Sequence, residues 1–307
     1  MKSLFSKAII ITSFTSFMYA LSSPTNHVVD TNWLKQNISD KNLVIIDTRK
    51  NKEYKKGHIK GAINYPKSTY FQGRLGNIPK LPNTLEQMQS MLQKAGVQED
   101  SMIVFYSAGK LNKDFADSAS GIWNTWLYGF KNTALLDGGF AKWTYEKNNI
   151  SNSSPTPIQS ELELESYDKS IIASSTDIQE AIYNDDIQIT DARVTEFYTG
   201  IDKRKDLARH GRIPTAKLTP VIRYVNYNKN YFTLVSKEIA NKTLHNSGYG
   251  VELDKPLNIY CNTGHKARGL WFISKFIIGM KDVKVYDGGI VEYSRTLLPM
   301  EKGEPMD

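Results

Sequence analysis

The chain has 307 residues, 40% of them hydrophobic and 11% aromatic, which is enough for two domains with apolar cores and excludes a largely disordered protein. The presence of one cysteine excludes an internal disulfide framework and a cysteine-cluster zinc site, and the five histidines lack the His-x-x-x-His spacing of a metal site. The formal net charge of +7 is mild and the basic residues are scattered, which does not favour nucleic acid as a partner.

Residues 1–22 have the pattern of a secretory signal peptide. Lys2 and Lys7 precede an uncharged stretch that ends near Leu21, and Ala20-Leu21-Ser22 offers a small-x-small cleavage site. The stretch is shorter than the roughly 20 apolar residues of a membrane span, and an uncleaved anchor is the alternative. We therefore expect export to the periplasm, if the source is bacterial, and no membrane contact after cleavage.

Along the rest of the chain, short apolar runs alternate with amphipathic stretches, which is typical of an α/β fold with a mostly parallel sheet. Residues 83–94 predict a helix, because their apolar side chains share one face, Asn83 and Glu86 resemble a capping box, and Gly96 suits a stop. Residues 267–278 also have helical spacing. The clearest predicted strands are Leu43–Asp47, Met102–Tyr106, Thr133–Asp137, Ile187–Asp191, Leu257–Cys261 and Val283–Asp287.

The predicted strands fall into two matching series. Asp47-Thr48-Arg49 is echoed by Asp191-Ala192-Arg193, the strand that leads to Ser107 is echoed by the strand that ends at Cys261, and each series ends in an Asp-Gly-Gly turn. The matching segments lie at nearly constant separations, which indicates one fold that was duplicated and then acquired loop insertions.

This repeat predicts a domain over residues 27–147 and a second domain over residues 166–300. Residues 148–165 join the two domains. Their first part is polar, rich in Ser, Asn and Pro, and without periodicity. We therefore interpret this segment as an interdomain linker.

Cys261 ends an apolar strand and is followed by Asn262-Thr263-Gly264-His265-Lys266 and a helical pattern. A short loop between a strand and a helix N-terminus directs successive backbone N–H groups at one point, which stabilises an anion and lowers the pKa of a thiol. We therefore expect Cys261 to be largely thiolate at neutral pH, with Gly264 allowing the loop to curl. The alternative is an inert core cysteine, although a lone thiol in an exported protein indicates that its reactivity is used.

With these motifs in this order, the two copies resemble tandem rhodanese domains, and the mature chain resembles a two-domain thiosulfate or 3-mercaptopyruvate sulfurtransferase. The resemblance rests on Asp47-x-Arg49, Gly57-His58-Ile59-x-Gly61-Ala62, both Asp-Gly-Gly turns and the Cys-x-x-Gly loop at Cys261. It implies that Cys261 takes sulfur from an anionic donor as a persulfide. The sulfur then passes to cyanide, a thiol or a protein thiol, with ping-pong kinetics.

The resemblance also implies a catalytically silent first copy, in which Ser107 occupies the cysteine position, and no metal or organic cofactor. We further expect a monomer. The residues predicted to bind the donor are those of the loop, Asn262, Thr263, Gly264, His265 and Lys266, together with Arg193. Among these, Lys266 would hold the anionic group and His265 would supply a second cation.

Several basic residues have an alternative interpretation. Arg193 could instead form a structural ion pair with Asp191 or a neighbouring acid. The basic segment Lys203-Arg204-Lys205, together with Arg209 and Arg212, either steers anions or is a solvated loop.

Asp47 and His58 match residues that mercaptopyruvate enzymes couple to a loop serine, so with Thr263 they are candidates for a proton relay. The alternative is that Asp47, Arg49 and His58 only hold their loops in place. The thiosulfate enzymes carry a further Arg where this chain has Phe197, whereas the mercaptopyruvate enzymes have Gly-Ser at the position of Asn262-Thr263. We predict thiosulfate as the favoured donor, because a fixed charge at Lys266 helps a dianion most, and 3-mercaptopyruvate is the alternative.

Two alternative functions would use a similar loop. A phosphatase of the same fold needs an Arg six residues after the cysteine, where this chain has Ala267. Arg268 comes one residue later, which turns its side chain by about 100° around a helix, so we reject the phosphatase. A non-enzymatic periplasmic persulfide carrier needs the same loop as the enzyme, and the sequence leaves that alternative open.

Overall fold

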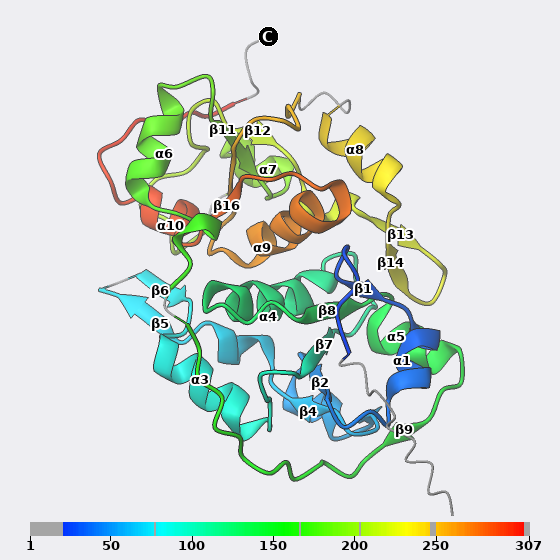
Figure 1. Cartoon of the computed structure of the whole chain (residues 1–307). Helices are drawn as coiled ribbons and strands as arrows, with labels where there is room; N and C mark the ends of the chain where they lie inside the picture. Colours follow the sequence, from blue (N-terminus) through cyan, green and yellow to red (C-terminus); the bar gives the residue numbers. More distant parts are fainter. Residues whose placement is uncertain (1–20, 77, 166, 203, 246–249, 304–307) are drawn as a thin grey trace, which may run out of the picture.

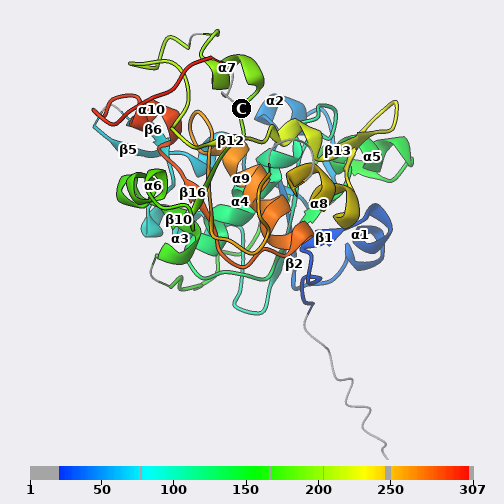
Figure 2. The same cartoon turned by 90° about the horizontal axis from the view of Figure 1, so that it is seen from above.

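The computed structural model describes residues 21–76, 78–165, 167–202, 204–245 and 250–303. Residues 1–20, which hold most of the expected signal peptide, lie outside the described residues. The described residues form two α/β halves, stacked in Figure 1 with the N-terminal half (blue to green) below the C-terminal half (green to red). Figure 2 shows the same arrangement from above.

The elements of the first domain alternate between short strands and helices, as the sequence pattern predicts. They are β1 Val28–Val29, α1 Thr31–Asn37, β2 Leu43–Asp47, α2 Asn51–Tyr54, β3 His58–Ile59, β4 Ile63–Asn64, the 3-10 turn η1 Lys67–Tyr70, β5 Gly73–Leu75, β6 Ile78–Leu81, α3 Leu85–Lys94, β7 Met102–Tyr106, α4 Phe115–Leu127, β8 Thr133–Leu136, α5 Gly139–Tyr145 and β9 Ile150–Ser151.

The second domain repeats this alternation. Its elements are η2 Lys169–Ile171, β10 Ile172–Ala173, α6 Ser175–Ile182, β11 Gln188–Asp191, α7 Thr195–Thr199, β12 Lys217–Leu218, η3 Val221–Arg223, β13 Val225–Tyr227, β14 Phe232–Leu234, α8 Lys237–His245, β15 Leu257–Tyr260, α9 His265–Phe272, the π-helix η4 Ile273–Ile278, β16 Val283–Tyr286 and α10 Gly289–Tyr293. The six predicted strands are confirmed to within one residue at each end.

Each domain is built on a five-stranded parallel sheet with the same connectivity. The order is β1-β8-β7-β2-β4 in the first domain and β10-β16-β15-β11-β12 in the second. The predicted α/β fold with two tandem copies is therefore confirmed. Because the carboxyl ends of parallel strands meet at one edge of a sheet, the loops after β7 and β15 occupy equivalent places.

The start of the third helix differs from the prediction. Thr84, not Asn83, is the N-cap residue of α3, and it forms the capping box with Gln87 instead of Glu86. The amide of Asn83 is instead used outside the helix, where it donates to Thr69 O (2.7 Å) and accepts from Gln72 N (3.2 Å). The predicted stop is confirmed, since Gly96 has φ +72° just after the helix.

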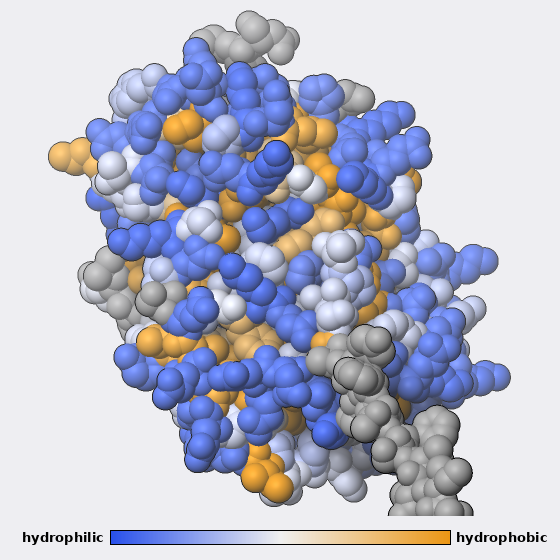
Figure 3. All heavy atoms as spheres, viewed as in Figure 1, coloured by the Kyte–Doolittle hydropathy of each residue, from blue (hydrophilic) through white to orange (hydrophobic). Residues whose placement is uncertain are grey.

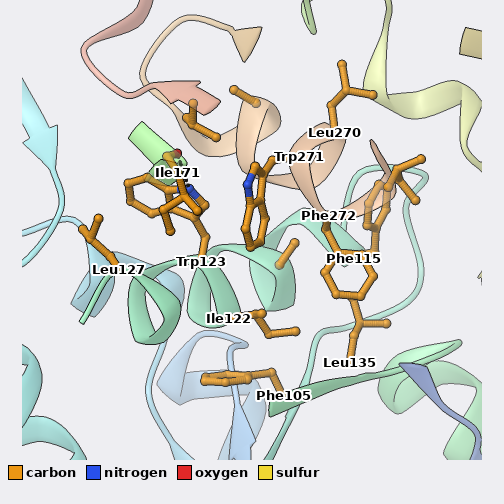
Figure 4. Close-up of a cluster of buried hydrophobic side chains, with 14 of the residues drawn as sticks. Phe105, Phe115, Ile122, Trp123, Leu127, Leu135, Ile171, Leu270, Trp271 and Phe272 are labelled. Carbon is orange, nitrogen blue, oxygen red and sulfur yellow. Dashed lines mark hydrogen bonds between the residues drawn. The ribbon is translucent and has the colours of Figure 1, made fainter. Parts of the chain in front are cut away.

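The two domains pack through α4 and α9, which lie against each other in the centre of the molecule (Figure 1). Figure 4 shows Trp123 and Phe115 of α4 facing Trp271 and Phe272 of α9, and all four side chains are buried. Burying side chains of this size stabilises a protein by roughly 1.5–3 kcal/mol each. The helix that follows the Cys261 loop is therefore fixed directly to the first domain.

The segment between the domains is bound to the surface of the first domain. It passes around α3 before it reaches the second domain (Figure 1). Ser160 bonds to Gln93 O and Val97 O through its N–H and hydroxyl, and the N–H of Leu164 donates to the side chain of Gln89. A free linker would let the two domains move relative to each other. Because these bonds hold the linker on the first domain, they limit that motion.

Hydrophilic residues cover most of the face seen in Figure 3, and hydrophobic residues show in patches between them. Among the residues that the structure describes, no helix has both the length and the apolarity needed to cross a membrane.

Candidate active site

The carboxyl edges of the two sheets share a framework of bonded side chains. Arg49 is bonded to Asp47 (2.5 Å) and to Gly57 O (2.8 Å), and Arg193 is bonded to Asp191 (2.6 Å) and to Gly211 O (2.8 Å). These bonds fix the turn after β2 and the turn after β11. Equivalent backbone bonds then fix the loop after β7 and the loop after β15.

Cys261 lies directly after β15, at the start of the short loop that leads into α9. Its carbonyl accepts the N–H of Ile290 (2.9 Å), as the carbonyl of Ser107 accepts that of Phe140 (2.9 Å). Gly264 has φ +74°, and a Cβ there would come within 2.2 Å of Asp287 Oδ1. The loop can therefore curl over Asp287 only with glycine at this position, as the sequence predicts.

The protonation of Cys261 differs from the prediction of a thiolate. Burial raises the pKa of the Cys261 thiol, and the backbone N–H groups of Ala267, Thr263 and Lys266 offset only part of this rise. The side chain is only 2% exposed. The predicted arrangement of loop amides is present, but the cost of burying a charged sulfur outweighs it. The thiol is therefore mainly protonated at neutral pH.

Lys266 is half-buried in the first turn of α9, and no carboxylate pairs with it among the described residues. Burial lowers the pKa of Lys266, the charge of Cys261 acts in the opposite direction, and Lys113 lowers it again. Since lysine starts several pH units above neutrality, we expect the side chain to remain charged at pH 7. Lys266 therefore provides positive charge near the sulfur without an internal partner.

His265 is not the free cation that the sequence suggested. Its Nε2 lies 2.6 Å from Oδ1 of Asp117, on α4 of the first domain. Burial lowers the pKa of His265, and Asp117 offsets only part of that effect. A neutral imidazole that donates to a carboxylate accounts for this pair, so His265 joins the domains instead of contributing positive charge.

The other two loop side chains differ in their exposure. Thr263 lines an open pocket of about 400 Å³ together with His265 and with Lys67, Ser68 and Phe71 of the first domain. Asn262 is buried, and its side-chain Oδ1 has no hydrogen-bond partner among the described residues. Thr263 is therefore able to contact a molecule in this pocket, whereas the side chain of Asn262 is buried.

Arg193 does not project into the site as a substrate-binding residue would. Its side chain is fully buried, and both Nε and one terminal nitrogen bond to Asp191. Arg193 therefore forms the ion pair with Asp191 that the sequence offered as the alternative to a contact with the donor, and its other terminal nitrogen is buried without a hydrogen-bond partner among the described residues. The pair supports the framework below the loop, as Asp47 and Arg49 do in the first domain.

Asp47 and His58 are also placed away from the predicted proton relay. Asp47 bonds to Arg49 and accepts from the hydroxyl of Tyr106 (2.6 Å). His58 stacks on Tyr54 at 3.8 Å, and its ring nitrogens lie 3.1 Å from Tyr54 O and 3.1 Å from Ser153 O. These contacts hold the first domain and the linker in place, and none of them reaches the Cys261 loop.

The first-domain residues that do face the loop were missed by the sequence analysis. Lys67, Ser68 and Phe71 come from the segment at η1, which carries no motif, and only the packing of the domains brings it to Thr263. Arg204 was considered only as part of a basic loop. Its bonds to Asp206 raise the pKa of Arg204, and the charge of Cys261 adds to that rise. Arg204 therefore lies within electrostatic reach of the sulfur.

Of the other basic residues of that region, Lys205 is exposed, whereas Arg209 and Arg212 have structural partners. Arg209 donates to the carbonyl oxygens of Ser294 and Thr296, and Arg212 pairs with Glu301. Lys203 lies outside the described residues. Within the predicted basic segment, Arg204 is thus the residue that the structure associates with the site.

The guanidinium of Arg268 lies in the domain interface. It bonds to Asp287 and lies 4.2 Å from the ring of Phe71 and 4.3 Å from the ring of Trp123. Burial lowers the pKa of Arg268 and raises that of Asp287 to about 6. This orientation is consistent with the rejection of a phosphatase, in which the guanidinium would have to face the ligand above the cysteine.

Comparison with known proteins gives the same repeat. The rhodanese-like domain matches residues 30–146 and 174–296. A protein of Saccharopolyspora erythraea, provisionally named thiosulfate sulfurtransferase, is 26% identical over 89% of this chain and 95% of its own length. The 3-mercaptopyruvate sulfurtransferase of Escherichia coli K12 is 25% identical over 90% of this chain and 98% of its own length. The crystal structure of SseA from Escherichia coli has the same fold, with a TM-score of 0.73, 24% identity, and coverage of 86% of this chain and 98% of that one.

Proposed function

This chain belongs to the rhodanese family, with two copies of the rhodanese-like domain in tandem, and we propose that it is a sulfurtransferase in which Cys261 carries the transferred sulfur. The observation that supports this most directly is the position of the single thiol. It lies at the carboxyl end of β15, with three backbone N–H groups, one of the loop and two of the first turn of α9, directed at its sulfur and the charge of Lys266 nearby. Relatives that span nearly the whole chain are named as sulfurtransferases.

The reaction proceeds in two displacements. The Cys261 thiolate attacks the outer sulfur of the donor, a new S–S bond forms, and the donor remainder leaves with the electron pair of the broken bond. An acceptor then attacks the terminal sulfur of the persulfide, and Cys261 leaves as a thiolate. The loop amides stabilise the sulfur anion in both steps. Because the resting thiol is protonated, the first displacement requires that its proton be lost to solvent.

Thiosulfate is the donor that the charges around Cys261 favour. When thiosulfate loses its outer sulfur the leaving group is sulfite, and no carbon skeleton has to be protonated. Lys266 supplies positive charge near the sulfur, and loop amides add to it. The relay once considered for 3-mercaptopyruvate is not supported, since Asp47 and His58 have other partners.

A steady-state assay with thiosulfate and cyanide, run beside one with 3-mercaptopyruvate and cyanide, tests this function. We expect turnover with both donors and a higher kcat/KM with thiosulfate. After treatment with thiosulfate, intact-mass analysis should show one added sulfur on the wild type and none on Cys261→Ser. Persulfide formation without turnover would instead indicate a sulfur carrier, and no added sulfur would refute the proposal.

We also propose that the chain is exported and that the signal peptide is removed near residue 22. The support is the pattern of Lys2, Lys7 and the uncharged stretch that follows them. Expression of the full chain in a bacterium, followed by fractionation and N-terminal sequencing, should yield a periplasmic protein that begins close to Ser23. A full-length product in the cytoplasm would contradict this.

A further inference from the structure

We propose that a cationic hollow in the first domain binds the carboxylates of an anionic thiol that accepts sulfur from Cys261, an inference that rests on the proposed function. The hollow has a volume of about 760 Å³. It lies at the carboxyl edge of the first sheet, beside the loop that follows Ser107. We call it the first-domain hollow, and its basic lining residues are Arg49, Lys50, Lys56, Lys67, Lys110 and Lys113.

The first-domain hollow has an excess of positive charge that the protein leaves unpaired. Lys50, Lys56, Lys110 and Lys113 are exposed, and none of them forms an ion pair among the described residues. Arg49 and Lys67 are already paired with carboxylates. The four lysines repel one another when no anion is bound. A ligand that carries two negative charges would therefore be attracted by all four side chains.

The carboxylates that line the first-domain hollow do not cancel this charge. Asp114 accepts the N–H groups of Lys110 and Leu111, both at 2.9 Å, and Asp117 bonds to Lys67 (3.0 Å) and to His265. Glu53, which lines the hollow as well, forms no ion pair among the described residues. Asp114 and Glu53 thus carry two negative charges without a cationic partner among the described residues, against four unpaired lysines, which leaves a net positive surface.

The first-domain hollow adjoins the site around Cys261. Lys67 and Ser68 line both the hollow and the smaller pocket that contains Thr263 and His265. Across the same boundary, the pKa of Lys266 is lowered by its burial and also by Lys113 of the first-domain loop. A molecule anchored in the hollow therefore lies next to the Cys261 loop.

The size of the first-domain hollow argues for an acceptor instead of a donor. Thiosulfate and 3-mercaptopyruvate are far smaller than the hollow and must bind directly at the sulfur. A longer thiol can hold its carboxylates among the lysines while its thiolate attacks the terminal sulfur of the Cys261 persulfide. The new S–S bond forms on the acceptor, the bond to Cys261 breaks, Cys261 leaves as a thiolate, and the acceptor's proton goes to solvent.

Acceptor kinetics test this site. The acceptors are glutathione, a tripeptide thiol with two carboxylates, and glutathione diethyl ester, in which both carboxylates are masked. The first measurement uses the preformed Cys261 persulfide. The readout is kcat/KM for glutathione divided by kcat/KM for its diethyl ester. We expect Lys110→Ala/Lys113→Ala to lower this ratio roughly fivefold, as removal of two exposed charges allows. Lys55→Ala removes an exposed lysine that does not line the hollow and should leave the ratio unchanged.

Binding without chemistry separates this proposal from the proposed function. Isothermal titration calorimetry with S-methylglutathione, which has both carboxylates but no thiol, should show binding that Lys110→Ala/Lys113→Ala weakens roughly fivefold and that added salt weakens further. If the ligand does not bind, or if the double variant binds it as the wild type does, the hollow is not the acceptor site. If the wild type binds S-methylglutathione but forms no persulfide, the proposed sulfurtransferase function is refuted, whereas the binding of carboxylates in the first-domain hollow is not.

Discussion

The two domains have the same framework and differ in the loop that follows the third strand of each sheet. In the first domain, α4 begins at Phe115, well beyond Ser107, whereas in the second domain α9 begins at His265, directly after the short Cys261 loop. In the first loop, the carboxylate of Asp114 accepts the N–H groups of Lys110 and Leu111. In the second loop, the free N–H groups are directed at the sulfur of Cys261.

This difference supports the proposal that the first copy is silent and the second is reactive. The ion pairs of Asp47 with Arg49 and of Asp191 with Arg193 have nearly the same geometry, so they serve the fold in both domains. The chemistry depends instead on loop length and on what the loop amides bind. A loop whose amides bind an internal carboxylate has none left for a substrate anion.

The largest effect is expected from exchanging the cysteine between the two loops. Cys261→Ser should reduce sulfur transfer to the background of the buffer, since the chain has one cysteine. The double variant Ser107→Cys/Cys261→Ser should not restore transfer, because Asp114 places a negative charge where the amides would have to stabilise a thiolate. Activity with thiosulfate and cyanide, together with intact mass, provides the measurement. Recovery of activity in the double variant would mean that loop geometry does not distinguish the domains.

The next effect is a steep dependence on pH. The thiolate is the reactive form, and burial raises the pKa of the Cys261 thiol, so the thiolate fraction grows about tenfold per pH unit below that pKa. We expect kcat/KM with thiosulfate to rise through neutral pH and to level off only in the alkaline range. Alkylation of the single thiol by iodoacetamide should follow the same profile without any substrate. A plateau that is already reached at acidic pH would show that the loop amides dominate over burial.

Removal of the charge at the start of α9 should have a smaller effect. Lys266→Ala should lower kcat/KM for thiosulfate roughly tenfold to a hundredfold, as expected for the loss of one charge-assisted contact of about 1.5–3 kcal/mol. Lys266→Arg should retain most of the activity, and Lys281→Ala, which removes an exposed lysine away from the site, is the control. If 3-mercaptopyruvate is the faster donor and Lys266→Ala leaves thiosulfate kinetics unchanged, the donor assignment is wrong.

The smallest effect is expected in the silent loop. Ser107 is buried, and its backbone carbonyl, which accepts the N–H of Phe140, does not depend on the side chain. Ser107→Ala should therefore keep kcat/KM within a few-fold of the wild type in the same assay. A loss comparable to that of Cys261→Ser would demonstrate chemistry in the first domain.

The sequence predicts the local features of this protein well. The strand ends, the duplication, the position of Cys261 between a strand and a helix, and the need for glycine at Gly264 all depend on patterns within a few residues or on a repeat. Even the error at α3 is local, since Thr84 caps the helix next to the predicted Asn83. Such features follow from backbone geometry and from the periodicity of apolar side chains.

Only the tertiary structure decided the chemistry of the individual side chains. His265 is bonded to Asp117 of the other domain, and His58 lies against the carbonyl of Ser153 in the linker. No local pattern specifies these two partners, whereas the pair of Arg193 with Asp191 lies within one Asp-x-Arg motif. The pKa of Cys261 depends on the balance between burial and loop amides. Burial is a property of everything packed around an atom, so the sequence predicts which residue holds the sulfur, whereas packing sets its charge and the residues that face it.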